Sequence, residues 1–397
     1  MRAITRPLNE FTDSNVDLND FAQSDGYLFV RDGIGLAGRG VARRINSGDA
    51  DELLKSIEHD STIDGPGTGA VLMGCIPFDS SSHHQFVLPS VIVGKGRDGQ
   101  QWLTTIDGAI PDLTVPDRQV ATSAIYTVKP GIDVQHYLNA VATARDMVRQ
   151  NLLAKAVIAR DVFVMSSLPI DVHAVLLRLR ASFGSSYRYS IDGFIGASPE
   201  LLVEVHDSEI SSHPLAGTTP RTGDPDTDAA LAKELMHSEK NQIEHRIVID
   251  MVHDTLLTWC SYLDWEPEPS IVAVANVQHL GTRMQGRLSQ PAPSVLELAY
   301  ALSPTPALGG HPRNEALKLI SMVEGFDRGL YGGAVGWVDG RGNGTWAVAI
   351  RCAELSADRT SARLFAGGGI VADSEPYAEL AETQAKFQAM LAAIIRP

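Results

Sequence analysis

Cysteine is scarce in this sequence. The 397 residues contain three cysteines, Cys75, Cys260 and Cys352, which are scattered and odd in number. Their number and spacing do not fit a disulfide framework and show no pattern of zinc ligands. The scarcity indicates a reducing compartment, so we expect a cytoplasmic protein. We interpret Cys352 as a small buried apolar side chain.

Long hydrophobic runs are also missing. No segment is long and apolar enough to cross a membrane, and the polar N-terminus, rich in Asp and Asn, shows no signal-peptide pattern. We therefore expect no membrane partner. The sequence likewise has no short-period repeat, no low-complexity tract, no dinucleotide-binding glycine fingerprint and no P-loop.

Positive charge is in short supply. There are 33 Lys and Arg residues against 48 Asp and Glu residues, which gives a formal net charge of -15 at pH 7. This balance argues against nucleic acid as the main partner and against an anionic membrane surface. An anionic substrate would need a local cluster of Arg, Lys, backbone N–H groups or a metal ion.

The composition is otherwise that of a soluble globular protein, with 44% hydrophobic and 20% charged residues. The length allows one large domain or two ordinary domains with a sizeable core. The sequence pattern changes weakly near 125–132, but no flexible linker marks the change. We therefore predict one compact unit, with 1–130 as its N-terminal part and 131–397 as its catalytic core.

The N-terminal part shows no spacing typical of a catalytic constellation. Residues 1–26 are polar without clear periodicity and are predicted to be a loosely held lead-in. Residues 27–45 alternate with glycines as paired strands do, and 77–130 predict further strands. His83 and His84 have no third ligand and are interpreted as part of a solvated loop.

The C-terminal part alternates helix and strand patterns. Residues 132–155 form an amphipathic helix pattern that runs into an apolar strand at 155–164. Residues 214–228 predict a loop, and 231–260 predict one long helix. The apolar stretch 271–280 predicts a strand.

The last third, 301–386, is dense in glycine and in side chains that bind or react. Arg351 ends an apolar strand, and a glycine run leads towards an acidic segment with a helical pattern. Glu379, Glu382 and Lys386 lie at i, i+3 and i+7 there, so they share one helix face. A cation site beside an anion site indicates the active site of a small-molecule enzyme.

Lys155 and Glu200 are candidate proton-transfer groups, and each also has an ordinary explanation. A lysine at a strand mouth is most often a solvated end residue, and an acid beside a proline is most often a turn residue. The functional interpretation makes Lys155 a partly desolvated base that acts on water. In an apolar pocket the pKa of Glu200 would rise, and its carboxyl would donate a proton to a leaving hydroxyl.

Carboxylates on two different helices are candidate metal ligands. Glu244 by itself is best explained as part of a solvated helix face. Paired with Glu382 from the last helix, with waters and an anionic substrate completing the shell, it suits Mg²⁺. Zinc does not fit, because neither helix offers a His or Cys ligand pattern.

Other residues suit an anion. Arg351 after an apolar strand would be costly to bury alone, and an anionic ligand would satisfy it through bidentate hydrogen bonds. Tyr331 and His279 are donors of a type that can join it, although each alone is more often a satisfied core residue. Pro214–Thr218 predicts a tight turn whose N–H groups hold a carboxylate, and Ala366–Gly369 predicts a turn that allows close backbone approach.

Taken in order, these motifs resemble those of the chorismate-utilising enzymes, a family that includes isochorismate, salicylate, anthranilate and aminodeoxychorismate synthases. The resemblance covers about 130–390 and does not depend on any single motif. The matching segments are KAVIAR, GASPELL, PLAGT, SEKNQIEH, VQHL, SPTPALGG, FDRGLYGGAVGW, AVAIRCAEL, FAGGGIV and ETQAKF.

Within this family the sequence is most similar to the isochorismate synthase branch of the siderophore-pathway type. Lys155 occupies the place of the water-activating base, where the anthranilate type usually has glutamine. Ala216 stands where the aminodeoxychorismate type usually has a nucleophilic lysine. The stretch Thr305–Leu308 and the segment around Arg351 also fit the isochorismate branch.

The resemblance implies an α/β (α+β) chorismate-binding-enzyme fold, in which two large, mostly antiparallel β-sheets face each other with helices outside. It implies an isomerase that converts chorismate to isochorismate with Mg²⁺ as cofactor. Lys155 would take a proton from the water that attacks carbon 2 of the ring, and Glu200 would protonate the hydroxyl that leaves carbon 4. The metal would neutralise a carboxylate that would otherwise repel the catalytic acids.

The resemblance also implies how the dicarboxylate substrate and the metal are held. The metal ligands would be Glu244, Glu382 and Glu379, with the ring carboxylate on the metal. The enolpyruvyl carboxylate would meet Arg351, Tyr331 and backbone N–H groups of the glycine run. The implied substrate-binding set is Gly217, Thr218, His279, Ala307, Leu308, Tyr331, Arg351, Gly367, Gly369 and Lys386.

The sequence departs from the family pattern at three positions. Asn241 stands where relatives often have an acid one turn before the metal glutamate, which weakens the expected metal site. Gly368 replaces an alanine. Tyr331 stands where some isochorismate synthases have Phe and salicylate synthases commonly have Tyr, which favours the lyase alternative slightly.

Three other functions stay open at this point. A salicylate synthase would go on to eliminate pyruvate, and small pocket residues near Ala307 and Leu308 would decide between the two outcomes. A catalytically silent binding subunit should have lost one of its catalytic residues, and none is lost. An amidotransferase-dependent synthase would need a glutaminase partner, against which Lys155 argues. We expect a monomer without a glutaminase subunit, and the siderophore, salicylate and menaquinone pathways stay open.

Overall fold

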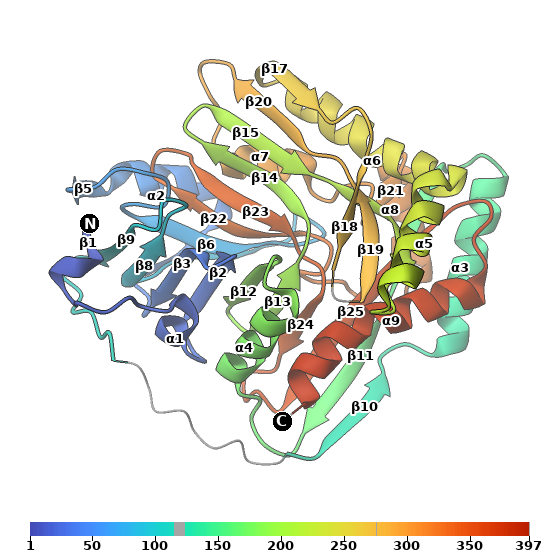
Figure 1. Cartoon of the computed structure of the whole chain (residues 1–397), viewed down its shortest axis with the longest axis horizontal. Helices are drawn as coiled ribbons and strands as arrows, with labels where there is room; N and C mark the ends of the chain where they lie inside the picture. Colours follow the sequence, from blue (N-terminus) through green and yellow to red (C-terminus); the bar gives the residue numbers. More distant parts are fainter. Residues whose placement is uncertain (115–123, 275, 397) are drawn as a thin grey trace.

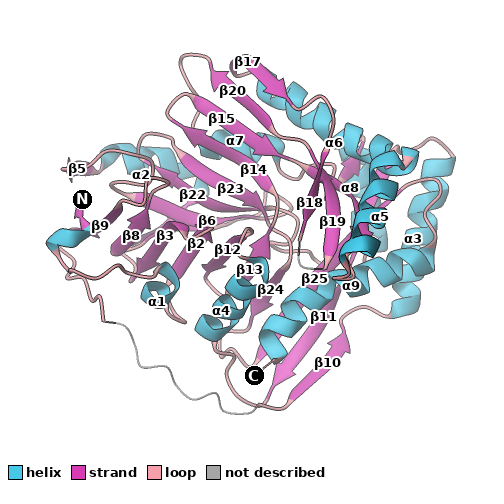
Figure 2. Cartoon of the chain, in the orientation of Figure 1, coloured by secondary structure: helices cyan, strands magenta, loops and turns pink. Residues whose placement is uncertain are grey.

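Two β-sheets form the centre of the structure, a computed structural model that describes residues 1–114, 124–274 and 276–396. The sheets pack against each other through a shared apolar core, and helices lie around them (Figures 1 and 2). Within the described residues, paired strands run antiparallel in both sheets, except that β1 and β5 are parallel. This arrangement confirms the predicted fold class.

The larger sheet has thirteen strands among the described residues. Several of its neighbouring strands are far apart in the sequence, such as β11 and β25 or β12 and β2. Its strands, in spatial order, are β10 (Tyr126–Pro130), β11 (Lys155–Ser166), β25 (Ser361–Ile370), β24 (Cys352–Leu355), β13 (Phe194–Ser198), β12 (Tyr187–Ile191), β2 (Tyr27–Arg31), β3 (Ile34–Arg39), β8 (Val91–Lys95), β9 (Gln101–Ile106), β1 (Arg2–Pro7) and β5 (Glu58–Ser61), with β21 (Gly310–His311) beside β11.

The second sheet has nine strands in the part of the chain that the structure describes. It also combines strands from both ends of the chain, which favours our prediction that 1–130 and 131–397 form one structural unit. Its strands are β17 (Cys260–Trp265), β20 (Met284–Leu288), β15 (Glu209–His213), β14 (Leu201–His206), β23 (Gly344–Val348), β22 (Ala334–Asp339), β6 (Val71–Ile76), β7 (Gln85–Leu88) and β4 (Arg43–Asn46).

A third, three-stranded sheet was not predicted. It consists of β16 (Leu215–Pro220), β19 (Val277–Gly281) and β18 (Ser270–Ala273). The prediction of a loop over 214–228 is therefore wrong at its start, because β16 pairs with β19 more than fifty residues away. The single strand predicted at 271–280 is divided between β18 and β19, which pair with each other, and residue 275 lies outside the described residues.

Strand β2 shows how the sheets acquire two apolar faces. Tyr27 and Phe29 pack into the core between the two large sheets, whereas Leu28 and Val30 pack under the outer helices. Because successive side chains of a strand point to opposite faces, a strand buried on both sides has a continuous apolar sequence.

The helices cover the outer faces and edges of the sheets. Helices α1, α4 and α9 pack on the larger sheet, α2, α6 and α7 on the nine-stranded sheet, and α3 and α8 beside β11 and β25. Their bounds are α1 (Leu18–Ala22), α2 (Ala50–Ser56), α3 (Val134–Arg149), α4 (Val172–Phe183), α5 (Pro225–His237), α6 (Glu239–Leu257), α7 (Val295–Leu302), α8 (Arg313–Val323) and α9 (Pro376–Ile395).

Two further predictions were wrong. Residues 231–260 form parts of two helices rather than one, because the Ser238 side chain caps α6 by accepting a hydrogen bond from the N–H of Asn241. Residues 1–26 are not a loose lead-in, since β1 is paired on both edges, and Arg2 and Arg6 both bind Asp60. Of the strands predicted over 77–130, the stretch 115–123 lies outside the described residues.

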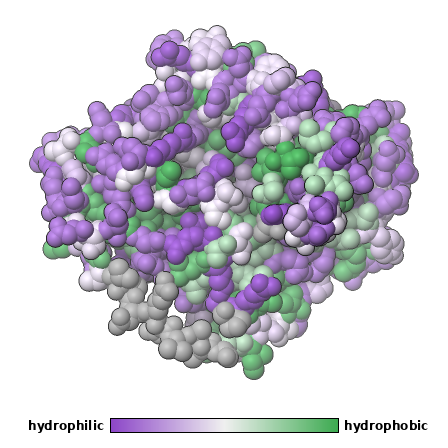
Figure 3. Space-filling view, viewed as in Figure 1, coloured by the Kyte–Doolittle hydropathy of each residue, from purple (hydrophilic) through white to green (hydrophobic). Residues whose placement is uncertain are grey.

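The surface seen in Figure 3 is largely hydrophilic, with smaller hydrophobic areas between the polar side chains. His83 is exposed in a loop, and His84 is bound to the hydroxyl of Tyr300 at 2.6 Å, which confirms that the pair is a loop feature. Cys352 is fully buried, as predicted. No helix in the described residues is long and apolar enough to span a bilayer.

Candidate active site

A cavity of about 160 Å³ lies where the chain passes from sheet to sheet. Pro199 and Glu200 connect β13 of the larger sheet to β14 of the nine-stranded sheet, and Ile350 and Arg351 return from β23 to β24. Every residue predicted for the site lines this cavity. They are Lys155, Glu200, Gly217, Thr218, Glu244, His279, Ala307, Leu308, Tyr331, Arg351, Gly367, Gly369, Glu379, Glu382 and Lys386.

Lys155 is the first residue of β11 and is fully buried, so it is not a solvated strand end. Its Nζ donates a hydrogen bond to Glu244 Oε1 at 2.8 Å, which joins β11 to α6. A Cβ atom on Gly369 of the neighbouring strand would lie 2.8 Å from Lys155 Cε. The glycine therefore leaves the space that the lysine side chain occupies.

Glu200 is the buried acid of the cavity. Burial raises the pKa of the Glu200 carboxyl to about 8, and a hydrogen bond from the Leu215 N–H and the charges of Lys155 and Arg351 oppose that rise. The carboxyl therefore holds its proton near neutral pH, which is the state that a general acid needs.

Arg351 is a buried cation at the other side of the site. The residue is 7% exposed, and its guanidinium donates a hydrogen bond to His279 Nε2 at 3.2 Å. Burial, together with the Arg351 charge, keeps the pKa of His279 well below its ordinary value, so the imidazole is neutral. Since Nε2 accepts, Nδ1 carries the hydrogen and donates it to the carbonyl of Gly217 at 3.3 Å.

Among the described residues, no carboxylate lies within ion-pair distance of Arg351. A buried guanidinium without an acid partner is unfavourable unless an anion comes to it. Arg351 also has a φ angle of 52°, which a non-glycine residue adopts at some cost in energy. The geometry at Arg351 therefore suits the binding of a carboxylate.

The segment Pro214–Thr218 is not the predicted tight turn. It enters strand β16, where the pairing with β19 shifts register between Ala216 and Thr218. Gly217 lies at this irregularity with a φ angle of 76°, which glycine tolerates. The bulge places Gly217 and Thr218 on the cavity wall beside His279.

Helix α9 supplies the acidic face that the sequence predicted. Glu382 Oε1 lies 2.6 Å from Lys386 Nζ, and the same ammonium donates a hydrogen bond to the carbonyl of Gly367 at 2.7 Å. Ser374 Oγ donates to Glu379 Oε1 at 2.7 Å. Burial, and then the charge of Glu382, raise the pKa of Glu379 to about 7.

Carboxylates of Glu244, Glu379 and Glu382 approach Gly368 and Gly369, and carboxylate oxygens are donors that suit a hard divalent cation. A Cβ on Gly368 would lie 2.6 Å from Glu379 Oε2, and a Cβ on Gly369 would collide with Glu244 Oε1. The glycines thus let carboxylates of α6 and α9 converge on one strand. Within the described residues, no group of three or more His, Cys, Asp or Glu side chains is arranged to hold a metal ion. Mg²⁺ commonly uses one or two carboxylates, with waters and substrate oxygens as its other ligands.

The glycine run Ala366–Gly369 is a strand rather than the predicted turn. It belongs to β25 and pairs with β11, with Gly367 opposite Ala159 and Gly369 opposite Val157. The prediction failed because glycine runs usually mark turns, whereas here the missing side chains make room for Lys155, Glu244 and Glu379.

The remaining wall is apolar and aromatic. The rings of Tyr331 and Phe365 stack with centroids 5.3 Å apart and an angle of 9° between their planes. Leu308 also belongs to this wall. It lies in a turn in which the N–H groups of Leu308 and Gly309 both donate to the carbonyl of Thr305. These contacts give the cavity one flat side that suits a ring.

Sequence reasoning missed several residues of the cavity wall. Lys240 lies four residues before Glu244 on α6, and its Nζ is 3.9 Å from Glu379 Oε1. That four-residue spacing was the available signal, because it places both side chains on one helix face. The other missed residues are Pro199, Ile350 and Phe365. Residues of the predicted motifs that also line the cavity are Leu215, Ala216, Asn241 and Ala366.

Comparison with known proteins identifies relatives over most of the chain. The family model described as "Chorismate binding enzyme" matches residues 79–395. A Mycobacterium tuberculosis protein that carries the name MenF is 39% identical over 341 residues, covering 83% of this chain and 87% of that protein. Isochorismate synthase DhbC of Bacillus subtilis is 35% identical over 335 residues, covering 82% and 80%. A crystal structure of DhbC from Bacillus anthracis superposes with a TM-score of 0.78 at 31% identity, covering 96% of this chain and 97% of that one.

Proposed function

The chain belongs to the family of chorismate-binding enzymes, and we propose that it is an isochorismate synthase, an isomerase that converts chorismate to isochorismate. One observation carries the proposal. A buried lysine, Lys155, and a buried acid that holds its proton, Glu200, line the same small cavity as Arg351, a buried arginine without an acid partner among the described residues. Base, acid and anion site are the groups that this isomerisation requires.

In the proposed mechanism, Lys155 and Glu200 act on opposite ends of the displaced π system. Lys155 accepts a proton from water as the water oxygen bonds to carbon 2 of the ring. Both ring double bonds shift, and the bond between carbon 4 and its hydroxyl breaks. Glu200 gives its proton to that hydroxyl, which leaves as water. Solvent then returns the two catalytic groups to their starting protonation states.

The cavity walls would hold the two carboxylates of chorismate. Arg351 would bind one carboxylate through its guanidinium, which His279 orients. The flat face of Tyr331 would lie along the ring system. Lys386, Gly217 and Thr218 lie on the wall where the second carboxylate would be placed.

Mg²⁺ is part of the proposal, and Glu244, Glu382 and Glu379 would hold it. When bound it would neutralise the ring carboxylate and orient it in the cavity. Lys155 now holds the Glu244 carboxylate at 2.8 Å, so Lys155 can serve as a base only when that carboxylate is engaged elsewhere.

The proposed activity is tested with the purified protein, chorismate and chromatographic separation of the products, with and without Mg²⁺. We expect isochorismate that depends on Mg²⁺ and accumulates without stoichiometric pyruvate. Salicylate with an equal amount of pyruvate would assign the chain to the lyase branch. Turnover only with ammonia or a glutaminase would contradict the base role of Lys155.

Replacing Arg351 by alanine is expected to weaken chorismate binding far more than it slows turnover. Two charge-assisted hydrogen bonds are lost, and about 3 kcal/mol of binding free energy corresponds to roughly a 100-fold rise in KM. The measurement is KM and kcat from initial rates at saturating Mg²⁺. The Arg351→Lys variant keeps the charge but loses the planar guanidinium. Its KM should lie between that of the unmodified enzyme and that of Arg351→Ala. An unchanged KM for Arg351→Ala would contradict the carboxylate-binding role.

Replacing Glu382 by glutamine is expected to raise the Mg²⁺ concentration needed for half-maximal activity by at least about tenfold, or ~1.4 kcal/mol. The reason is the loss of a full negative charge from the proposed ligand set. Glu375→Gln is the matched control, because Glu375 lies at the start of the same helix with its side chain 69% exposed. A metal titration identical to that of the unmodified enzyme would exclude Glu382 as a ligand.

A further inference from the structure

Strand β11, which begins with Lys155, has an edge that no strand of the described residues covers along its middle. On one side β25 pairs with β11 from Ala156 to Met165. On the other side β21 pairs only with Lys155 and Ala156, and β10 pairs only from Val162 to Ser166. The backbone of 157–161 therefore lies in a gap between two partner strands.

A buried ion pair fills this gap. Glu324 at the end of α8 and Arg328 four residues later are 1% and 2% exposed, and Arg328 Nε donates to Glu324 Oε2 at 2.8 Å. Glu324 Oε1 accepts the N–H of Ala159 at 2.7 Å, and Arg328 Nη2 donates to the carbonyl of Val157 at 2.7 Å. These side chains satisfy the backbone groups that a neighbouring strand would otherwise satisfy.

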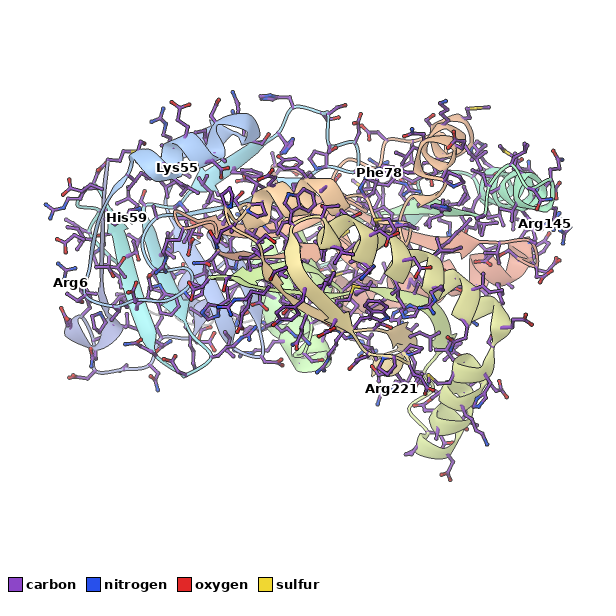
Figure 4. The ribbon with its side chains drawn as sticks, turned by 90° about the horizontal axis from the view of Figure 1, so that it is seen from above. Arg6, Lys55, His59, Phe78, Arg145 and Arg221 are labelled. Atoms are coloured by element: carbon purple, nitrogen blue, oxygen red, sulfur yellow. The ribbon has the colours of Figure 1, made fainter. Side chains whose placement is uncertain are left out.

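The same arginine reaches the opposite wall of the cavity. Its Nη1 donates to the carbonyl of Leu308 at 2.8 Å. The Arg328 guanidinium also lies 4.2 Å from the ring centroid of Phe78, which is labelled in Figure 4, and 5.8 Å from that of Tyr331. The pair therefore contacts three cavity-lining parts of the chain: β11 after Lys155, the Leu308 turn and Tyr331.

We propose that Glu324 and Arg328 are positioning residues that take the place of a strand on β11 and hold Lys155 at a fixed place relative to Leu308 and Tyr331. Neither side chain lines the cavity, so neither touches the substrate. Their effect is on the geometry of the base, and this inference rests on the proposed function. A displacement of about 1 Å at a catalytic group can cost on the order of 100-fold in rate.

The physical alternative is that the pair only stabilises the fold. A buried ion pair is costly to form, and well-packed apolar residues of similar volume often replace one without loss of stability. Positioning explains the retention of two charges better, because Leu and Met side chains cannot bind the carbonyls of Val157 and Leu308 or the N–H of Ala159.

The test uses the double variant Glu324→Leu/Arg328→Met, since a single substitution would leave one buried charge unpaired and the protein unfolded. We expect a folded protein with a lowered melting temperature, because the N–H of Ala159 and the carbonyls of Val157 and Leu308 lose their partners. We also expect a kcat about 100-fold lower and a KM changed by less than about threefold. Amide hydrogen exchange followed by mass spectrometry should quicken in the peptide covering 155–161 and stay unchanged in α9.

The control is Arg44→Met/Asp192→Asn, which removes a half-exposed ion pair that joins β4 to the turn after β12 away from the cavity. It should leave kcat, KM and exchange at 155–161 unchanged. Unaltered kcat and exchange in a stable Glu324→Leu/Arg328→Met variant would overturn the proposal. The proposal would also be overturned if kcat and the melting temperature fell and amide exchange quickened throughout the chain rather than at 155–161. That result would indicate a purely structural role.

Failure of the proposed function is distinguishable from failure of this inference. If the unmodified enzyme forms no isochorismate, the proposed function is wrong, and the exchange experiment still shows whether the pair holds β11. If the unmodified enzyme is active and the double variant matches it, only the positioning role is wrong.

Discussion

Replacing Lys155 by alanine is expected to lower kcat for isochorismate formation by about 10³-fold, within the range that a general base contributes. The variant lacks the amine that would take the proton from the attacking water. The measurement is product formation from chorismate at saturating Mg²⁺, followed by chromatography. Binding of the metal should persist, because Lys155 is a counter-charge to Glu244 rather than a ligand. Turnover at the rate of the unmodified enzyme would contradict the assignment of Lys155 as the general base.

A second substitution at the same position separates charge from basicity. Lys155→Arg keeps a cation beside the Glu244 carboxylate, which Lys155 contacts at 2.8 Å, and so preserves the ion pair that joins β11 to α6. A guanidinium stays protonated at any working pH and cannot accept a proton from water. We therefore expect Lys155→Arg to be nearly as slow as Lys155→Ala but more stable. Activity restored by arginine would show that Lys155 acts only through its charge.

The order of motifs in the sequence predicted which residues meet in the cavity, whereas single residues did not. Arg351 and His279 are 72 positions apart, and Lys155 and Glu244 are 89 apart. No pattern in the neighbouring sequence predicts either contact. Each residue, considered alone, therefore had an ordinary explanation as a core or surface side chain. The contacts arise because the chain crosses between the sheets at Glu200 and at Arg351.

The predictions that failed concern backbone conformation rather than residue choice. Pro214–Thr218 and Ala366–Gly369 both have turn-like sequences, yet both lie in strands. Their partners, β19 and β11, come from distant parts of the chain, and pairing with them outweighs the local preference of glycine for turns. Helix α3 and strand β11 were predicted well because their apolar periodicity is local.

Replacing Glu200 by glutamine is expected to lower kcat by roughly 10³-fold, because the amide cannot give a proton to the leaving hydroxyl. It is also expected to stabilise the protein near neutral pH. Glu204→Gln is the matched control, since Glu204 lies outside the cavity on β14, the strand that directly follows Glu200, and is bound by Arg97. Initial rates and thermal unfolding are measured for both variants. A Glu200→Gln variant as fast as the Glu204→Gln control would contradict the acid role.

The pH dependence of both effects follows from the pKa of Glu200, which burial raises from 4.5 to about 8 in the folded protein. Below pH 8 the folded protein holds the proton, so ionisation of Glu200 should not lower kcat there and should lower it about tenfold per pH unit above pH 8. Between 4.5 and 8 the unfolded chain has released the proton while the folded protein retains it. Stability therefore decreases as pH rises through this window, by roughly 3 kcal/mol at pH 7.

Glu200→Gln removes this titration, so its melting temperature should depend less on pH between about 5 and 8 than that of the unmodified enzyme. The gain in stability and the loss of turnover would then have one cause, the burial that keeps a carboxyl protonated where the reaction needs an acid. If the melting temperatures of the two proteins changed with pH in the same way across that range, Glu200 would ionise normally in the folded protein. In that case the alkaline fall in kcat would have to come from another group.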